Sequence, residues 1–142
     1  MPSLNTNEKV YDYKLNFDGC SKGNPGLAGA GAVIYHLDKE IWFDTLLVGE
    51  KCTNNHAEYA GLLLGLEQAK ALNIKCIKIE GDSQLVINHM KGIYKCKSDN
   101  LLPLYKKAKE LETFFDKIDY IHVLRNQNKR ADELSNIAII PN

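Results

Sequence analysis

Four acidic side chains occupy positions that suit metal-ion chemistry. Asp18 and Asp82 each end a stretch with strand character, whereas Glu58 and Asp132 lie near the expected starts of helices. In an open α/β sheet, the carboxyl ends of parallel strands and the helix N-termini that follow them meet at one edge. We therefore expect the four carboxylates to converge, provided that the first and fourth strands are parallel neighbours.

Each acid also has a purely structural interpretation. Asp82 could cap the helix that follows it, and Asp18 could form a turn with Gly19. Glu58 and Asp132 could simply complement helix dipoles. Convergence favours the chemical interpretation, because clustered carboxylates raise one another's pKa and cost stability unless cations occupy the site.

Oxygen ligands with this much negative charge suit Mg²⁺ or Mn²⁺. Two such ions about 3.5–4 Å apart can hold a phosphodiester, one activating the attacking water and the other stabilising the leaving oxygen. The acids therefore predict metal-dependent phosphoryl chemistry.

The elements expected to position the acids follow the order βββαβααβα. Near-alternating apolar and aromatic residues predict a first strand that starts at Val10 and ends at Asp18. Residues 19–31 hold five glycines and a proline, which indicates a loop. Strands over 30–38 and 41–49 are expected to form an antiparallel hairpin. The remaining expected elements are strands over 76–81 and 117–125 and helices over 54–73, 82–92, 101–115 and 128–140, the first capped by Asn54 or Asn55.

A hairpin followed by alternating helices and strands predicts the α/β class, with a five-stranded mixed sheet flanked by helices. The sheet would combine the antiparallel hairpin with parallel strands. The length of 142 residues suits one domain. We expect residues 1–9 to be a flexible N-terminus and residues 10–140 to form that single domain.

Four motifs, in order along the chain, resemble those of type 1 ribonucleases H. They are Asp18-Gly19-x-x-x-Gly23-Asn24-Pro25-Gly26, Thr53-Asn54-Asn55-x-x-Glu58, Gly81-Asp82-Ser83-Gln84-Leu85-Val86 and Arg125-x-x-Asn128-x-x-Ala131-Asp132-x-Leu134. The implied domain covers nearly the whole chain and has the ribonuclease H-like fold.

The resemblance implies an endoribonuclease that hydrolyses the RNA strand of RNA/DNA hybrids and leaves 3′-hydroxyl and 5′-phosphate ends. It implies two Mg²⁺ ions, or Mn²⁺ in their place, held by four acids that are both catalytic residues and metal ligands. Asp18 and Asp82 would bridge or flank the ions. Glu58 would bind one ion and hold the region of the RNA 2′-OH, and Asp132 would complete the shell of the second ion.

The resemblance also implies contacts with the hybrid. The substrate-binding candidates are Gly19, Asn24, Thr53, Asn54, Asn55 and Gln84. Asn24, Asn55 and Gln84 would read minor-groove edges or the RNA strand, and Thr53 would bind a phosphate of the DNA strand. Hydroxyl and amide groups suit this role because they can donate to and accept from a 2′-OH. Loop and cap hydrogen bonding is the alternative for each.

Two auxiliary candidates lie before the last acid. Many relatives carry a histidine there, and counting back ten positions from Asp132 reaches His122, although the expected strand continues through it. Relatives with the Arg-x-x-Asn-x-x-Ala-Asp pattern often lack that histidine, and Arg125 matches this pattern.

Composition limits the partners. With 18 basic and 18 acidic residues the net charge is zero, which excludes a strongly basic nucleic-acid wrapper. The basic residues gather in the second half of the chain, as a solvated face or as contacts with a nucleic-acid backbone. The candidates for such contacts are Lys91, Lys95, Lys97, Lys106 and Lys107.

No apolar run approaches the roughly 20 residues of a membrane helix, and no signal peptide is evident. We therefore expect an intracellular protein, cytoplasmic by default, with no membrane association. A monomer without an obligate protein partner is the default, and the four cysteines are expected to be free thiols.

Two other functions stay open. The chain could be a nuclease of the same fold with another substrate, such as DNA or double-stranded RNA, and strand choice would separate this from hybrid cleavage. It could instead be a non-catalytic nucleic-acid-binding module. The clustered acids argue against a mere binder, because unneeded carboxylates cost stability.

Overall fold

A computed structural model describes residues 11–140. The expected flexible residues 1–9 and the expected strand start at Val10 lie outside this range. The strands are β1 (Tyr13–Gly23), β2 (Gly26–His36), β3 (Lys39–Cys52), β4 (Cys76–Gly81) and β5 (Lys117–His122). The helices are α1 (Asn54–Ala71), α2 (Gln84–Met90), α3 (Leu102–Glu112) and α4 (Lys129–Ile137), with a short 3₁₀ turn at Arg125–Gln127.

The five strands form one mixed sheet in the order β3-β2-β1-β4-β5, which confirms the predicted fold class. β2 is antiparallel to both β1 and β3, whereas β1, β4 and β5 run parallel. The first and fourth strands are therefore parallel neighbours, the condition on which convergence of the acids depended.

Residues 19–31 are not a loop, and this expectation was wrong. β1 and β2 run through this segment, and only Asn24 and Pro25 lie between them. The glycines serve close packing: a Cβ on Gly31 would lie 2.5 Å from the Leu134 Cβ of α4, and a Cβ on Gly19 would lie 2.1 Å from the Ala57 carbonyl carbon of α1. Helices can approach the sheet this closely only where side chains are missing.

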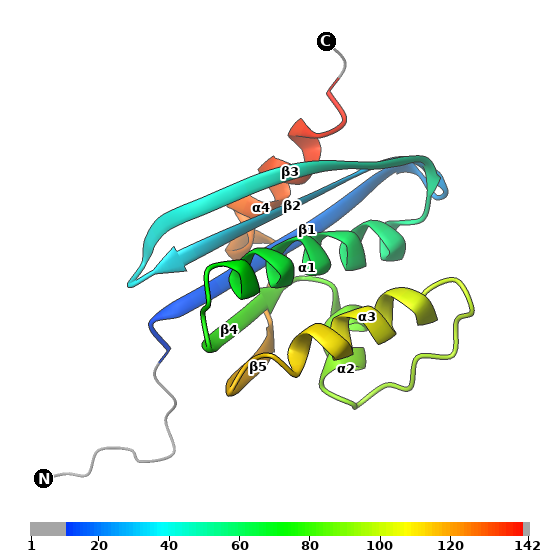
Figure 1. Ribbon diagram of the computed structural model, residues 1–142. Helices are drawn as coiled ribbons and strands as arrows, with labels where there is room; N and C mark the ends of the chain where they lie inside the picture. The colour runs from blue at the N-terminus through cyan, green and yellow to red at the C-terminus, as the bar shows by residue number, and fades with distance from the viewer. Residues whose placement is uncertain (1–10, 141–142) are drawn as a thin grey trace, which may run out of the picture.

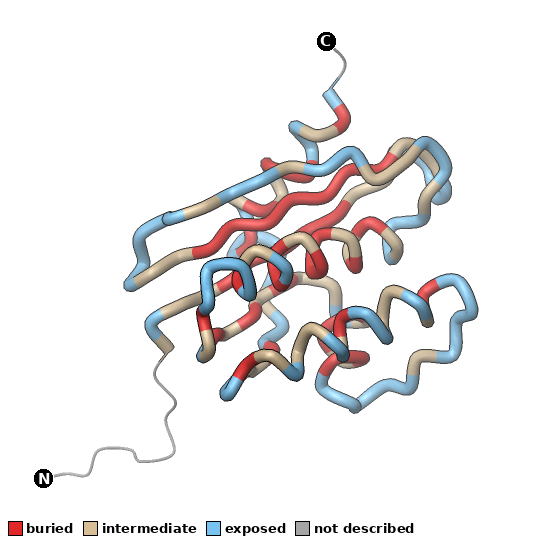
Figure 2. Tube along the Cα trace, viewed as in Figure 1, coloured by how far each residue is buried: buried red, intermediate tan, exposed pale blue. Residues whose placement is uncertain are grey.

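Helices cover both faces of the sheet (Figure 1). α1 lies on one face, with α3 packed against it and α2 close by, and α4 lies on the other face. Figure 2 shows that the buried residues concentrate in the central strands and in the side of α1 that faces them. The core beneath α1 contains the fully buried Leu15, Phe17, Ile34, Leu62, Leu66 and Ile79.

Helix α1 is capped one residue earlier than expected. Thr53 is the N-cap, and its hydroxyl accepts a hydrogen bond from the His56 backbone N–H at 3.1 Å. Asn54 and Asn55, the expected caps, are instead the first two helical residues. An N-cap residue needs an extended backbone and a side-chain oxygen that accepts from an otherwise unpaired N–H in the first helical turn. Thr53 has both.

Other element boundaries also differ from expectation, most clearly that of the last strand. The last strand ends at His122 rather than continuing to residue 125, and Arg125 opens the 3₁₀ turn. All four cysteines are free, as expected. Within residues 11–140, no helix combines the length and the apolar character needed to cross a membrane.

Candidate active site

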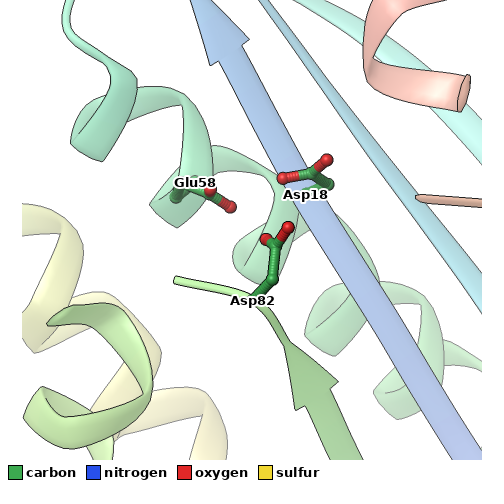
Figure 3. Close-up of side chains that lie close together, drawn as sticks. All are labelled: Asp18, Glu58 and Asp82. Carbon is green, nitrogen blue, oxygen red and sulfur yellow. The ribbon is translucent and has the colours of Figure 1, made fainter. Parts of the chain in front are cut away.

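Three carboxylates from three different elements point toward one another (Figure 3). Asp18 comes from β1, Glu58 from α1 and Asp82 from the residue after β4, and one oxygen of each lies within 4.8 Å of the others. The register explains the meeting of the two aspartates: Phe17 pairs with Gly81, so the residue after each faces the same space. Asp18 stands in the middle of its strand, not at its end as expected, because β1 continues to Gly23.

Asp132 reaches the same place from the opposite face of the sheet. It lies in the first turn of α4 and lines a cavity of about 320 Å³ together with the three other acids. Its side chain interacts with that of Asp18. Two neighbouring parallel strands and the N-terminal parts of two helices thus gather all four predicted acids around one cavity.

Burial dominates the electrostatics of the cluster. Asp18 is only 4% exposed, and this burial, together with the negative charge of Asp82 and the contact with Asp132, raises the pKa of Asp18 to about 8. The Gly19 backbone N–H donates to Asp18 Oδ1 at 2.9 Å and opposes the rise. Burial and the charges of Asp18 and Asp82 raise the pKa of Glu58 well above its usual value.

These carboxylates repel one another, and bound divalent cations would compensate their negative charge. The buried Oε1 of Glu58 has no hydrogen-bond partner among residues 11–140. An orphaned buried oxygen beside two other acids is costly unless a cation compensates it. The all-oxygen donor set is the kind that Mg²⁺ and Mn²⁺ prefer.

Local structure leaves two acids free to face the cavity. Ser83, not Asp82, caps α2, because its hydroxyl accepts from the Val86 backbone N–H at 3.2 Å. The absence of a side chain on Gly19 lets β1 touch the backbone of α1 next to Glu58. The capping interpretation of Asp82 is therefore wrong.

Three of the substrate-binding candidates form a cluster at the start of α1. Asn24 Oδ1 accepts from the Asn54 backbone N–H at 3.0 Å, next to the capping Thr53, and Asn54 and Gly19 line the cavity. Asn55 and Gln84 are exposed in the first turns of α1 and α2. Their contact with a substrate stays a prediction.

Of the two auxiliary candidates, only Arg125 lies at the cavity. Arg125 lines the cavity, and its Nη2 lies 3.9 Å from Asp132 Oδ1, although its side chain is 80% exposed. His122 ends β5 as an exposed residue and does not line the cavity.

Sequence reasoning missed two residues near the acids. Cys20 lines the cavity. Asn16 is buried on the same face of β1 as Asp18, two residues earlier. A polar residue in an otherwise apolar stretch of strand, at that spacing from Asp18, was the available signal for Asn16.

Comparisons with known proteins find similar chains. A family model described as reverse transcriptase-like matches residues 16–138. The chain is 42% identical over 126 residues to the bifunctional protein Rv2228c of Mycobacterium tuberculosis, covering 88% of this chain and 35% of that protein. It is 39% identical over 123 residues to ribonuclease HI of Halobacterium salinarum, covering 87% of this chain and 62% of the other. The chain thus spans about a third of the first protein and under two thirds of the second.

Solved structures match over most of both chains. The N-terminal RNase H domain of Rv2228c superimposes with a TM-score of 0.86 at 40% identity, covering 89% of this chain and 92% of the other. LC11-RNase H1 in complex with an RNA/DNA hybrid gives a TM-score of 0.84 at 32% identity, with coverages of 89% and 96%. The chain belongs to the reverse transcriptase-like family and is a ribonuclease H domain.

Proposed function

We propose that this chain is an endoribonuclease that hydrolyses the RNA strand of RNA/DNA hybrids with two Mg²⁺ ions, leaving 3′-hydroxyl and 5′-phosphate ends. The observation that carries the proposal is the convergence of four acids on one cavity, with Asp18 buried among them. The similarity to LC11-RNase H1, whose structure contains an RNA/DNA hybrid, supports this substrate. The expected cytoplasmic, monomeric state stays a prediction.

The residues of the site would have different roles in the proposed reaction. Divalent ions, when bound, lower the pKa of the attacking water and neutralise charge on the leaving oxygen. Asp18 interacts with both Asp82 and Asp132, so these three carboxylates would hold the ions together. Glu58 offers the unpartnered Oε1 as a ligand. Asp18 must lose its proton before it can serve as a ligand, because only the carboxylate form binds a cation well.

Substrate selection would rest on the cluster at the start of α1. Asn24 accepts a hydrogen bond from the Asn54 backbone, Thr53 caps the helix directly before Asn54, and Asn54 lines the cavity. The amide of Asn24 can exchange hydrogen bonds with a 2′-OH, which DNA lacks, whereas the Thr53 hydroxyl would contact a phosphate of the DNA strand. This is the feature that would direct cleavage to the RNA strand.

The test is the exchange Asp82→Asn in a cleavage assay with labelled RNA/DNA hybrid, with single-stranded RNA, double-stranded RNA and duplex DNA alongside. The wild type should cut only the RNA of the hybrid, and only with Mg²⁺ or Mn²⁺. Asp82→Asn should lower kcat by at least about 100-fold, as removal of a preorganised electrostatic group typically does.

Asp116→Asn is the matched control, since Asp116 is exposed between α3 and β5. Undiminished cleavage by Asp82→Asn would remove the mechanism. Cleavage of duplex DNA would point to another nuclease, and salt-sensitive hybrid binding without any cleavage would point to a binding module.

A further inference from the structure

Asn16 lies on β1 two residues before Asp18, and none of the predicted catalytic roles involves it. It is 5% exposed, and Asn128, its partner at the start of α4, is 2% exposed. Asn16 Nδ2 donates to Asn128 Oδ1 at 3.0 Å and to Glu80 Oε1 at 3.2 Å. A buried amide pair that joins a strand to a helix across 112 positions of sequence calls for a physical explanation.

The second amide is bound to the same strand. Asn128 Nδ2 donates to the Phe17 carbonyl oxygen at 2.9 Å, so β1 holds both ends of the Asn128 amide. The Phe17 carbonyl can only accept, which orients Nδ2 of Asn128 toward it and Oδ1 toward Asn16. Asn16 must then present its own Nδ2, and both hydrogens of that group are used. The orientation of each amide follows from the other.

The hydrogen-bonded pair of Asn16 and Asn128 anchors the start of α4, the helix that carries Asp132 in its first turn. Asn128 is the N-cap residue of α4, yet its side chain makes no capping bond and reaches the sheet instead. The Asp132 backbone N–H donates to the Asn128 carbonyl at 3.1 Å, so Asp132 lies about one helical turn beyond the anchored residue. The Phe17 carbonyl that accepts from Asn128 belongs to the peptide leading into Asp18.

We propose that Asn16 is a positioning residue: through Asn128 it fixes the first turn of α4 against β1 and so sets Asp132 in place opposite Asp18. Glu80 holds the Asn16 amide from β4, the strand that ends next to Asp82. The strand that carries Asp18, the strand that ends next to Asp82 and the helix that carries Asp132 are thereby joined by one network, which is buried at both asparagines. The consequence for catalysis rests on the function proposed above, whereas the effect on cation binding needs only the four carboxylates.

The test compares Asn16→Leu, which removes the donor at similar volume, with Tyr59→Phe. Tyr59→Phe deletes a buried hydrogen bond of 2.7 Å to His89 beneath α1, on the face of the sheet away from α4. Thermal unfolding in chelator measures the cost to the fold of each exchange. Unfolding over a Mg²⁺ series then measures cation binding, and hybrid cleavage gives kcat and KM.

Asn16→Leu should stay folded, need about 10- to 100-fold more Mg²⁺ for half of the thermal shift, and lose kcat by a similar factor with KM little changed, because residues that orient ligands typically have effects of this size. Tyr59→Phe should lose stability but keep the Mg²⁺ dependence and kcat. If Asn16→Leu does not fold, Asn16→Ser, which is too short to reach Asn128, replaces it with the same expected result.

A folded Asn16 variant with the wild-type Mg²⁺ dependence would overturn the proposal, as would an equal loss of Mg²⁺ affinity in Tyr59→Phe. If the wild type binds Mg²⁺ without cutting hybrid while the Asn16 variant binds it more weakly, the proposed function fails and the positioning role stands. If the wild type cuts hybrid and the variant matches it in both measurements, the positioning role alone fails.

Discussion

Asp18 combines deep burial with two acidic neighbours. Its carboxyl is buried in the middle of β1, faces Asp82 and Asp132, and has a pKa raised to about 8. An acid with a raised pKa holds a proton in the folded state that the unfolded chain has already released. Folding without a metal therefore becomes less favourable as pH rises from the ordinary aspartate pKa toward about 8. A cation that replaces the proton on Asp18 stabilises the folded state and so offsets this loss of stability.

The wild type is predicted to show a larger Mg²⁺-induced rise in Tm at about pH 8.5 than at about pH 6, because at the lower pH Mg²⁺ must compete with the proton on Asp18. The measurement is thermal unfolding at both pH values, with Mg²⁺ and with chelator. Asp18→Asn should flatten the metal-free loss of stability between the two pH values and abolish the Mg²⁺ response, and Asp116→Asn should behave as the wild type. An equal Mg²⁺ response of the wild type at both pH values would contradict the assignment.

At the scale of elements, the start of α1 matters most. The helix carries Glu58 on its second turn, and its N-terminus is held by the Thr53 cap and by the bond from the Asn54 backbone to Asn24. Thr53 thus has a structural role, whether or not its hydroxyl also contacts a DNA phosphate. The turn between β1 and β2 and the first turn of α1 consequently form one unit beside the cavity.

Thr53→Ala should lower the free energy of unfolding by about 1 kcal/mol, the usual cost of losing a hydroxyl N-cap, whereas Thr53→Ser should stay close to the wild type. Denaturant unfolding measures both. The same exchange at Thr113, an exposed residue at the end of α3, should change stability by less than about 0.5 kcal/mol. A Thr53→Ala variant as stable as the wild type would show that the cap contributes little.

At the scale of the molecule, the zero net charge conceals an uneven distribution. Lys91, Lys95 and Lys97 lie exposed on the connection between α2 and α3, whereas Lys107 is paired with Glu67 at 3.0 Å. Unpaired surface lysines are the ones available to a nucleic-acid backbone. We therefore expect the connection between α2 and α3 to contribute to hybrid binding.

The double exchange Lys95→Gln with Lys97→Gln should weaken hybrid binding and reduce the slope of log affinity against log salt by about 2, since each phosphate contact contributes roughly 0.9 to that slope on a duplex. Binding titrations over a salt series measure this. Lys39→Gln with Lys117→Gln removes the same charge from exposed sites at the β2–β3 turn and the start of β5, and should leave the slope nearly unchanged. Equal effects of the two pairs would mean that only net charge matters.

Much of this protein could be read from local patterns. Strand alternation and helical spacing depend on near neighbours in the chain, so the main elements and the fold class were predicted correctly. The four acids were found because the local pattern placed each at the expected end of a strand or near the expected start of a helix, although β1 continues beyond Asp18. The glycines of residues 19–31 misled, because a glycine that admits a helix against a strand has the same local signature as a glycine in a loop.

Only the tertiary structure decided how the acids meet and what they experience. The pairing of β1 with β4 joins residues that are 64 positions apart, and the burial that raises the Asp18 pKa comes from helices on both faces of the sheet. The contact between Asn16 and Asn128 likewise depends on how α4 docks. Desolvation and long-range contacts are properties of the packed molecule, whereas residue type and spacing are already present in the chain.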